Sequence, residues 1–135
     1  MVDYSSNSAI QRFRQYLQIK TCPPNAKKSK CVNFLLEIAR ELYLQAKVLE
    51  LAEGYPIVLL TWPGQEANVP SIILSSHYDV VPVSEEFWEW DPFSAKMREN
   101  GDIVARGAQD MKCVGMAYLE AIRSLKEATF TPKQS

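Results

Sequence analysis

The chain has 135 residues, of which 47% are hydrophobic and 23% charged, the composition of an ordinary globular domain. A formal net charge of -1 excludes the basic surface that nucleic acid or an anionic membrane requires. The longest apolar run, Ile57–Leu60, is far shorter than the roughly 20 residues of a membrane span. Three cysteines without CxxC spacing argue against a disulfide framework. We therefore expect a soluble, cytoplasmic protein with reduced thiols.

Two amphipathic helices are predicted at the start of the chain. Ile10, Phe13 and Leu17 recur at helical spacing after a Ser/Asn cluster able to cap a helix, and Pro23-Pro24 prevents continuation. A second apolar stripe predicts a helix from Ser29 to about Gln45. This stripe needs a sheet or another partner to cover it.

Strand-like segments follow the second helix. Lys47–Leu51 and Tyr55–Trp62 are separated by a glycine-containing turn and could pair as a hairpin. Ser71–Ser76 is apolar at its centre, which is typical of a strand buried on both faces of an α/β sheet. We expect this segment to be the central strand.

The last third of the chain predicts a second hairpin and a third helix. Ala95–Ala105 carries an Asn-Gly turn between strand-like halves, and a helix follows Asp110 and ends before Pro132. The predicted fold class is α/β, a partial three-layer sheet with flanking helices. Because the chain stops just after a helix, where another strand is expected, we expect part of a larger fold.

Two positions suit chemistry at the edge of such a sheet. His77 directly follows the predicted central strand, and Asp79 lies two residues later, where strand periodicity puts both side chains on one side. A histidine can bind a metal through one ring nitrogen while a carboxylate holds the other. From spacing alone, a surface histidine beside a turn aspartate is the simpler interpretation. Asp110, at a second strand-to-loop junction, is by itself most simply a helix cap.

Three blocks of sequence connect these residues. SSHYDVVPV (Ser75–Val83), WDPF (Trp90–Phe93) and ARGAQDMKC (Ala105–Cys113) resemble the zinc-dependent family of aminoacylases, carboxypeptidases and succinyl-diaminopimelate desuccinylases. The form of the third block is similar to the aminoacylase branch, and LTWPG and FRQYL extend the resemblance over nearly the whole chain. One departure is Tyr78, where the aminoacylase pattern usually has Thr.

The resemblance implies a role for each candidate residue. His77 would be a ligand of one zinc ion, Asp110 would bridge two zinc ions, and Asp79 would be the catalytic carboxylate that orients the His77 ring. The implied reaction is hydrolysis of N-acyl-L-amino acids, small-molecule substrates, by a full-length parent that is a homodimer. The resemblance also implies a cis peptide bond between Asp110 and Met111.

The family's remaining functional residues do not occur in this chain. Its catalytic Glu pair follows the bridging aspartate, whereas Glu85-Glu86 precedes it and is more simply a solvated loop charge. We therefore expect residues 1–135 to be the amino-terminal portion of a metallohydrolase catalytic domain, without the lid and dimerisation domain or the carboxyl-terminal part, and inactive alone. The alternatives are a non-catalytic truncated form that pairs with a full-length subunit, and a truncated gene model.

Further residues admit simpler roles. Lys112 and Arg106 match family positions, where salt bridging or helix-end packing is the simplest account. Four aromatic residues either line a substrate cleft or pack in the core or rim, namely Trp62, Phe87, Trp88 and Trp90.

Overall fold

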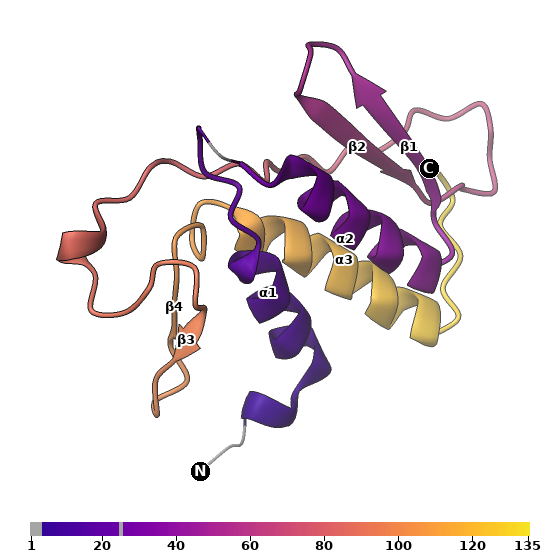
Figure 1. Ribbon diagram of the computed structural model, residues 1–135. Helices are drawn as coiled ribbons and strands as arrows, with labels where there is room; N and C mark the ends of the chain where they lie inside the picture. Colours follow the sequence, from indigo (N-terminus) through magenta and orange to yellow (C-terminus); the bar gives the residue numbers. More distant parts are fainter. Residues whose placement is uncertain (1–3, 25) are drawn as a thin grey trace. The chain divides into compact units, whose positions relative to one another are not determined.

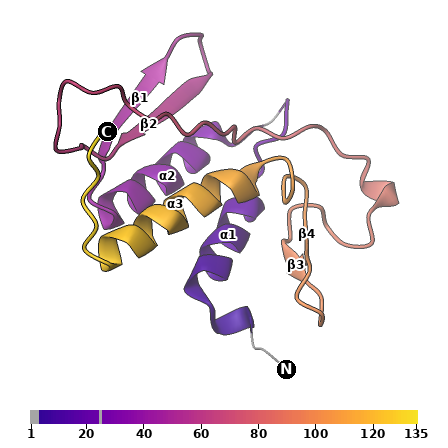
Figure 2. The same cartoon turned by 180° about the vertical axis from the view of Figure 1, so that it is seen from behind.

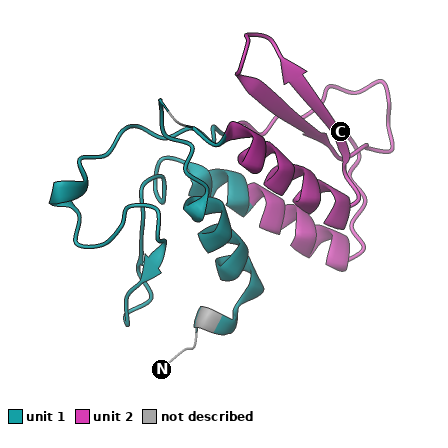
Figure 3. Cartoon of the chain, in the orientation of Figure 1, with its two compact units in different colours: residues 1–27, 76–117 teal, residues 28–75, 118–135 magenta. Residues whose placement is uncertain are grey.

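The computed structural model describes residues 4–24 and 26–135, which divide into two compact units (Figures 1 and 3). Unit 1 contains the described residues up to 27 and residues 76–117, and unit 2 contains residues 28–75 and 118–135. Helix α3, Lys112–Glu127, begins in unit 1 and continues in unit 2. Among the described residues, no helix is long and apolar enough to cross a membrane.

Helix α1, Ser8–Gln18, is the first regular helix of unit 1 and follows the short 3-10 helix η1, Tyr4–Ser6. The Asn7 side chain accepts hydrogen bonds from the backbone N–H groups of Ala9 and Ile10, so the predicted polar cap is confirmed. The apolar face of α1 packs into a hydrophobic cluster that contains Leu17, Ala95 and Ala105, with Phe13 against it. The helix therefore covers the hairpin region of the same unit.

The hairpin of unit 1 is short. Strands β3, Lys96–Met97, and β4, Ile103–Val104, pair antiparallel, and Gly101 takes φ 93° in the turn between them. A further 3-10 helix, η2, covers Glu85–Phe87. A second apolar cluster of Cys22, Val80 and Phe93, with Val83 packed against it, anchors the segment that follows His77.

Unit 2 is built on a longer hairpin. Strands β1, Gln45–Glu50, and β2, Pro56–Thr61, pair antiparallel in full register, as predicted. Helix α2, Lys28–Glu41, packs against them and buries Cys31, Val32, Ile38 and Ala39. Figures 1 and 2 show the later part of α3 beside α2. The Arg123 guanidinium lies 2.9 Å from a Glu41 carboxylate oxygen.

Helix α2 ends earlier than its apolar pattern predicts. The expected end was near Gln45, but the helix stops at Glu41. Tyr43 has a positive φ of 50°, which leaves the right-handed helical region and turns the chain into β1.

The α/β class is confirmed, but the central strand is not. Ser71–Ser76 forms no strand, and Ile72, Ile73 and Leu74 are 63%, 84% and 56% exposed. An apolar run becomes a strand only where a neighbouring strand completes its hydrogen bonds. Here the Ile72 N–H donates to the Ser135 carbonyl, without a ladder to any strand in the described part of the chain.

Candidate active site

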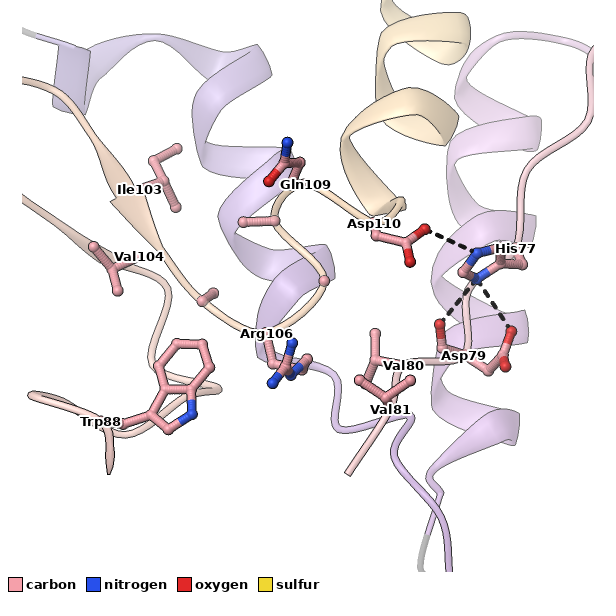
Figure 4. Close-up of a pocket in the computed structure, with 13 residues that line it drawn as sticks. His77, Asp79, Val80, Val81, Trp88, Ile103, Val104, Arg106, Gln109 and Asp110 are labelled. Carbon is pink, nitrogen blue, oxygen red and sulfur yellow. Dashed lines mark hydrogen bonds and ion pairs between the residues drawn. The ribbon is translucent and has the colours of Figure 1, made fainter. Parts of the chain in front are cut away.

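The only histidine of the sequence lies between two carboxylates (Figure 4). His77 Nε2 is 3.2 Å from Oδ1 of Asp110, and His77 Nδ1 is 3.2 Å from Oδ1 of Asp79. Nδ1 also lies 3.0 Å from the Asp79 carbonyl oxygen. All three side chains belong to unit 1; the two carboxylates are largely exposed to solvent and the imidazole is about half exposed. The structure therefore brings the three candidate residues together.

Asp110 reaches His77 from the turn that precedes α3. The Asp110-Met111 peptide bond is cis, so this expectation is confirmed as well. The Lys112 N–H donates to the Gly107 carbonyl at 3.1 Å, which closes the loop around Asp110. In the described residues, the Asp110 carboxylate is hydrogen-bonded to His77 and to no N–H of α3. The simpler interpretation of Asp110 as a helix cap is therefore not supported.

One segment of chain, Tyr16–Thr21 at the end of α1, holds both sides of the site. The Lys112 ammonium is completely buried and donates hydrogen bonds to the carbonyls of Tyr16 (3.0 Å) and Ile19 (2.8 Å). The Thr21 hydroxyl, also completely buried, donates to the Tyr78 carbonyl. Lys112 lies two residues after Asp110 and Tyr78 lies between His77 and Asp79. The Tyr16–Thr21 segment therefore positions all three candidate residues.

A glycine in α3 allows the chain before His77 to lie close to the helix. A Cβ atom at Gly115 would meet the Ser76 Oγ atom at 2.7 Å, inside van der Waals contact. The segment that carries His77 therefore lies against the early part of α3, near the turn that carries Asp110.

A cavity of about 440 Å³ opens beside the three residues and is lined by unit 1 alone. His77, Asp79 and Asp110 form its polar side, and Trp88, Ile103 and Val104 contribute apolar surface. Figure 4 shows Arg106 between Trp88 and Val80. The cavity thus combines a group of possible metal ligands, an apolar wall and a cation, a combination suited to a small polar ligand with an apolar part.

The other residues singled out from sequence divide between site and scaffold. Of the four aromatic residues, Trp88 lines the cavity, whereas Trp62 packs edge-on against Phe130 within unit 2. Glu85-Glu86 is exposed in η2 and does not line the cavity, as expected of a solvated pair. For Lys112, helix-end packing is confirmed. Sequence reasoning missed Thr21, which carries no motif.

The donor atoms present fit part of a zinc site. Two ligand atoms, each about 2.0–2.1 Å from one tetrahedral zinc ion, lie about 3.3 Å from each other. The 3.2 Å between His77 Nε2 and Asp110 Oδ1 matches this spacing. The position of Asp79 at the opposite ring nitrogen matches the partner that orients metal-bound histidines. The described residues contain no group of three or more possible ligands, so they supply an incomplete set.

Comparisons with known proteins find a similar family and a similar structure. The family model described as "Peptidase family M20/M25/M40" matches residues 73–135, which include all three candidate residues. An M20 family metallo-carboxypeptidase from Sulfolobus solfataricus has a similar structure, with a TM-score of 0.77 and 28% sequence identity over 91% of this chain and 28% of that chain. The resemblance to this metallohydrolase family is confirmed.

Three similar curated sequences are aminoacylases. Human aminoacylase-1 is 50% identical over 87% of this chain and 29% of its own length. Aminoacylase-1A of Rattus norvegicus is 51% identical over 90% of this chain and 30% of its own. Aminoacylase-1 of Dictyostelium discoideum is 39% identical over 95% of this chain and 31% of its own. The chain thus spans about a third of the length of these relatives.

Proposed function

We propose that residues 1–135 are the amino-terminal portion of a metallohydrolase catalytic domain that hydrolyses N-acyl-L-amino acids to a carboxylate and a free amino acid. The observation that carries this proposal is the placement of His77 between Asp79 and Asp110 in a sequence about 50% identical to aminoacylase-1. The identity extends over 87% of this chain, which argues for the same reaction class.

Each residue has a separate task in this proposal. His77 would hold one zinc ion through Nε2, and Asp110 would be a ligand shared by that ion and a second one. Asp79 accepts a hydrogen bond from the Nδ1–H group, which would fix the tautomer that leaves the Nε2 lone pair free to bind, and it is the catalytic carboxylate of the set. When bound, zinc polarises the amide carbonyl and acidifies water near neutral pH.

The described residues alone are insufficient for turnover. A catalytic zinc site uses about three protein ligands per ion, and the described residues offer no group of that size. The cavity side chains include no glutamate that could act as general base, a role that contributes on the order of 10²–10⁴ in rate. We propose that the 135-residue chain binds zinc weakly and does not catalyse hydrolysis alone.

The same similarity to aminoacylases supports a proposal for the oligomeric state, the substrate and the cellular compartment. We propose a homodimeric parent, a small-molecule N-acyl amino acid as substrate, and the cytoplasm as the compartment. The three cysteines of the described chain are free thiols, which suits a reducing compartment.

A zinc titration followed by NMR tests the metal site, because a single histidine gives unambiguous imidazole signals. We expect zinc to shift the His77 ring signals, and Asp110→Asn to weaken the apparent affinity by about tenfold or more. Asp102→Asn is the matched control, since this exposed carboxylate lies in the β3–β4 turn and should leave the affinity unchanged. Zinc that leaves the His77 signals unmoved would contradict the proposed metal site.

Hydrolysis of N-acetyl-L-methionine by the same chain with added zinc tests its completeness. We expect no turnover above background. Zinc-dependent turnover that disappears in His77→Ala would show that the chain assembles a sufficient site from its own residues or by self-association.

A further inference from the structure

Two arginines of unit 1 stack on tryptophans at the same distance. The Arg98 guanidinium carbon lies 5.3 Å from the Trp90 ring centroid, and that of Arg106 lies 5.3 Å from the Trp88 ring centroid. Both are within the range of cation–π attraction. The two guanidinium groups lie at the same distance from their rings, so their other contacts can be compared.

The two guanidinium groups differ in how their charge is compensated. Arg98 Nη2 lies 3.0 Å from a Glu89 carboxylate oxygen. Arg106 forms no ion pair with an Asp or Glu in the part of the chain that the structure describes, and its buried Nε has no hydrogen-bond partner there. Guanidinium groups without an acceptor are unusual, because buried donors are nearly always satisfied. The Arg106 side chain therefore has donors left for a ligand.

The location of Arg106 indicates what that ligand is. Arg106 lines the same cavity as His77, Asp79 and Asp110. In Figure 4 the carboxylates lie on the side of His77, and Trp88 lies on the other side of Arg106. A ligand that carries an anionic group would be repelled by the aspartates and attracted to the guanidinium. The cavity therefore favours one orientation of a ligand with a single negative end.

We propose that Arg106, held against Trp88, binds the carboxylate of the substrate in this cavity. The planar guanidinium matches a carboxylate with two parallel hydrogen bonds, and stacking on an aromatic ring leaves its N–H edge available. The scissile amide is then directed towards His77 and Asp110. This assignment rests on the proposed hydrolysis of N-acyl amino acids and adds a substrate-binding residue to it.

Carboxylate-dependent binding tests the assignment without any turnover. The 135-residue chain is titrated with N-acetyl-L-methionine and with its methyl ester, which lacks the negative charge, and the Trp88 indole N–H signal is followed by NMR. We expect the acid to bind about tenfold more tightly than the ester, as for a charge-assisted bidentate contact. The ratio should fall to about one in Arg106→Met, and to an intermediate value in Arg106→Lys, which keeps the charge but loses the fork.

Arg98→Met is the matched control, because it removes an equivalent stack whose charge is already paired. It should leave the acid-to-ester ratio unchanged. The proposal is wrong if the unsubstituted chain does not prefer the acid, or if the preference survives in Arg106→Met. Should Arg106→Met fail to fold, an unchanged ratio in Arg106→Lys would overturn the bidentate contact.

A third variant separates this proposal from the proposed function. His77→Ala should abolish the effect of zinc on the NMR spectrum and leave the acid-to-ester ratio intact. If zinc binds at His77 but the ratio does not depend on Arg106, only the assignment of Arg106 as the carboxylate-binding residue is wrong. If the ratio depends on Arg106 but zinc does not bind, the proposed metal hydrolase function is wrong and the carboxylate-binding role of Arg106 is kept.

Discussion

The hydrogen bonds that stabilise unit 1 internally differ in kind from those that stabilise unit 2. In unit 2, two strands of six residues form a regular ladder, and α2 covers them with an apolar face. In unit 1 the strands have two residues each, and side chains of α1 and α3 reach backbone carbonyls far away in the sequence. Arg14 donates to the Ala95 carbonyl, and Lys112 donates to those of Tyr16 and Ile19.

This difference matters because the candidate site lies entirely in unit 1. A ladder distributes its stabilisation over many equivalent bonds, so the loss of one side chain is tolerated. In a scaffold of a few buried polar contacts, each contact carries a larger share of the stabilisation, because the loss of one donor leaves a buried carbonyl unsatisfied. Single polar substitutions should therefore cost more in unit 1 than in unit 2, and they should disturb the site as well.

The largest effect is expected from Lys112→Met, which preserves the length of the side chain. The change leaves the Ile19 carbonyl without the Lys112 donor and the Tyr16 carbonyl with only the Ile19 N–H, at a cost of about 1–3 kcal/mol in the free energy of unfolding. Urea denaturation measures this cost, and the zinc titration should show weaker binding. Lys96→Met, at an exposed position of β3, should shift the midpoint little. Equal urea midpoints for the two variants would contradict the idea that a few buried polar contacts stabilise unit 1.

Thr21→Val tests the other side of the same scaffold. Valine matches threonine in shape, but the Tyr78 carbonyl loses its hydroxyl donor, so we expect a loss of about 1–2 kcal/mol. The matched change in unit 2 is Thr61→Val in β2, where a β-branched residue suits the strand and the cost should stay within about 0.5 kcal/mol. Urea denaturation compares the two, and the prediction is wrong if Thr61→Val is the costlier one.

A double-mutant cycle at Gly115 and Ser76 should give a smaller, coupled effect. Alanine favours a helix over glycine by about 1 kcal/mol, but the Cβ of Gly115→Ala would meet Ser76 Oγ at 2.7 Å. We expect Gly115→Ala to be neutral or destabilising alone and to stabilise the Ser76→Ala variant, with a coupling energy of about 1 kcal/mol. Additive effects of the two substitutions would refute the close approach.

The smallest effect is expected from the ion pair between Arg123 and Glu41 in unit 2. Glu41 is 54% exposed on its side chain, so solvent screens its attraction to Arg123. Glu41→Gln should cost no more than about 0.5 kcal/mol, and the difference should vanish in about 1 M salt. Thermal unfolding at low and high salt measures it. A loss as large as that of Lys112→Met would erase the contrast between the units.

The elements predicted best from sequence are those with a strong local pattern. The apolar spacing of α1 and α3 and the turn signals of the two hairpins identify these elements because local residues decide them. Ser71–Ser76 was misassigned because an apolar run carries no information about whether a neighbouring strand is present. The residue types of this segment are compatible with a strand, but whether a strand forms depends on a pairing partner elsewhere in the chain.

The candidate site shows the same limit. His77, Asp79 and Asp110 were identified through the motifs they share with a family, whereas spacing alone favoured ordinary roles. Lys112 lies 96 and 93 residues from its partners Tyr16 and Ile19, and Thr21 lies 57 residues from Tyr78. No periodicity or turn pattern reports on pairs so distant, so the supporting contacts required the structure.

The burial of Lys112 also gives the chain a built-in chemical reporter. Amine-reactive reagents should acylate exposed lysines such as Lys47, Lys96 and Lys133 rapidly, because their ammonium groups meet solvent. Lys112 is 0% exposed and becomes reactive only when its surroundings open. Its labelling rate in the native state, read by mass spectrometry, therefore measures how often the turn that carries Asp110 separates from the end of α1.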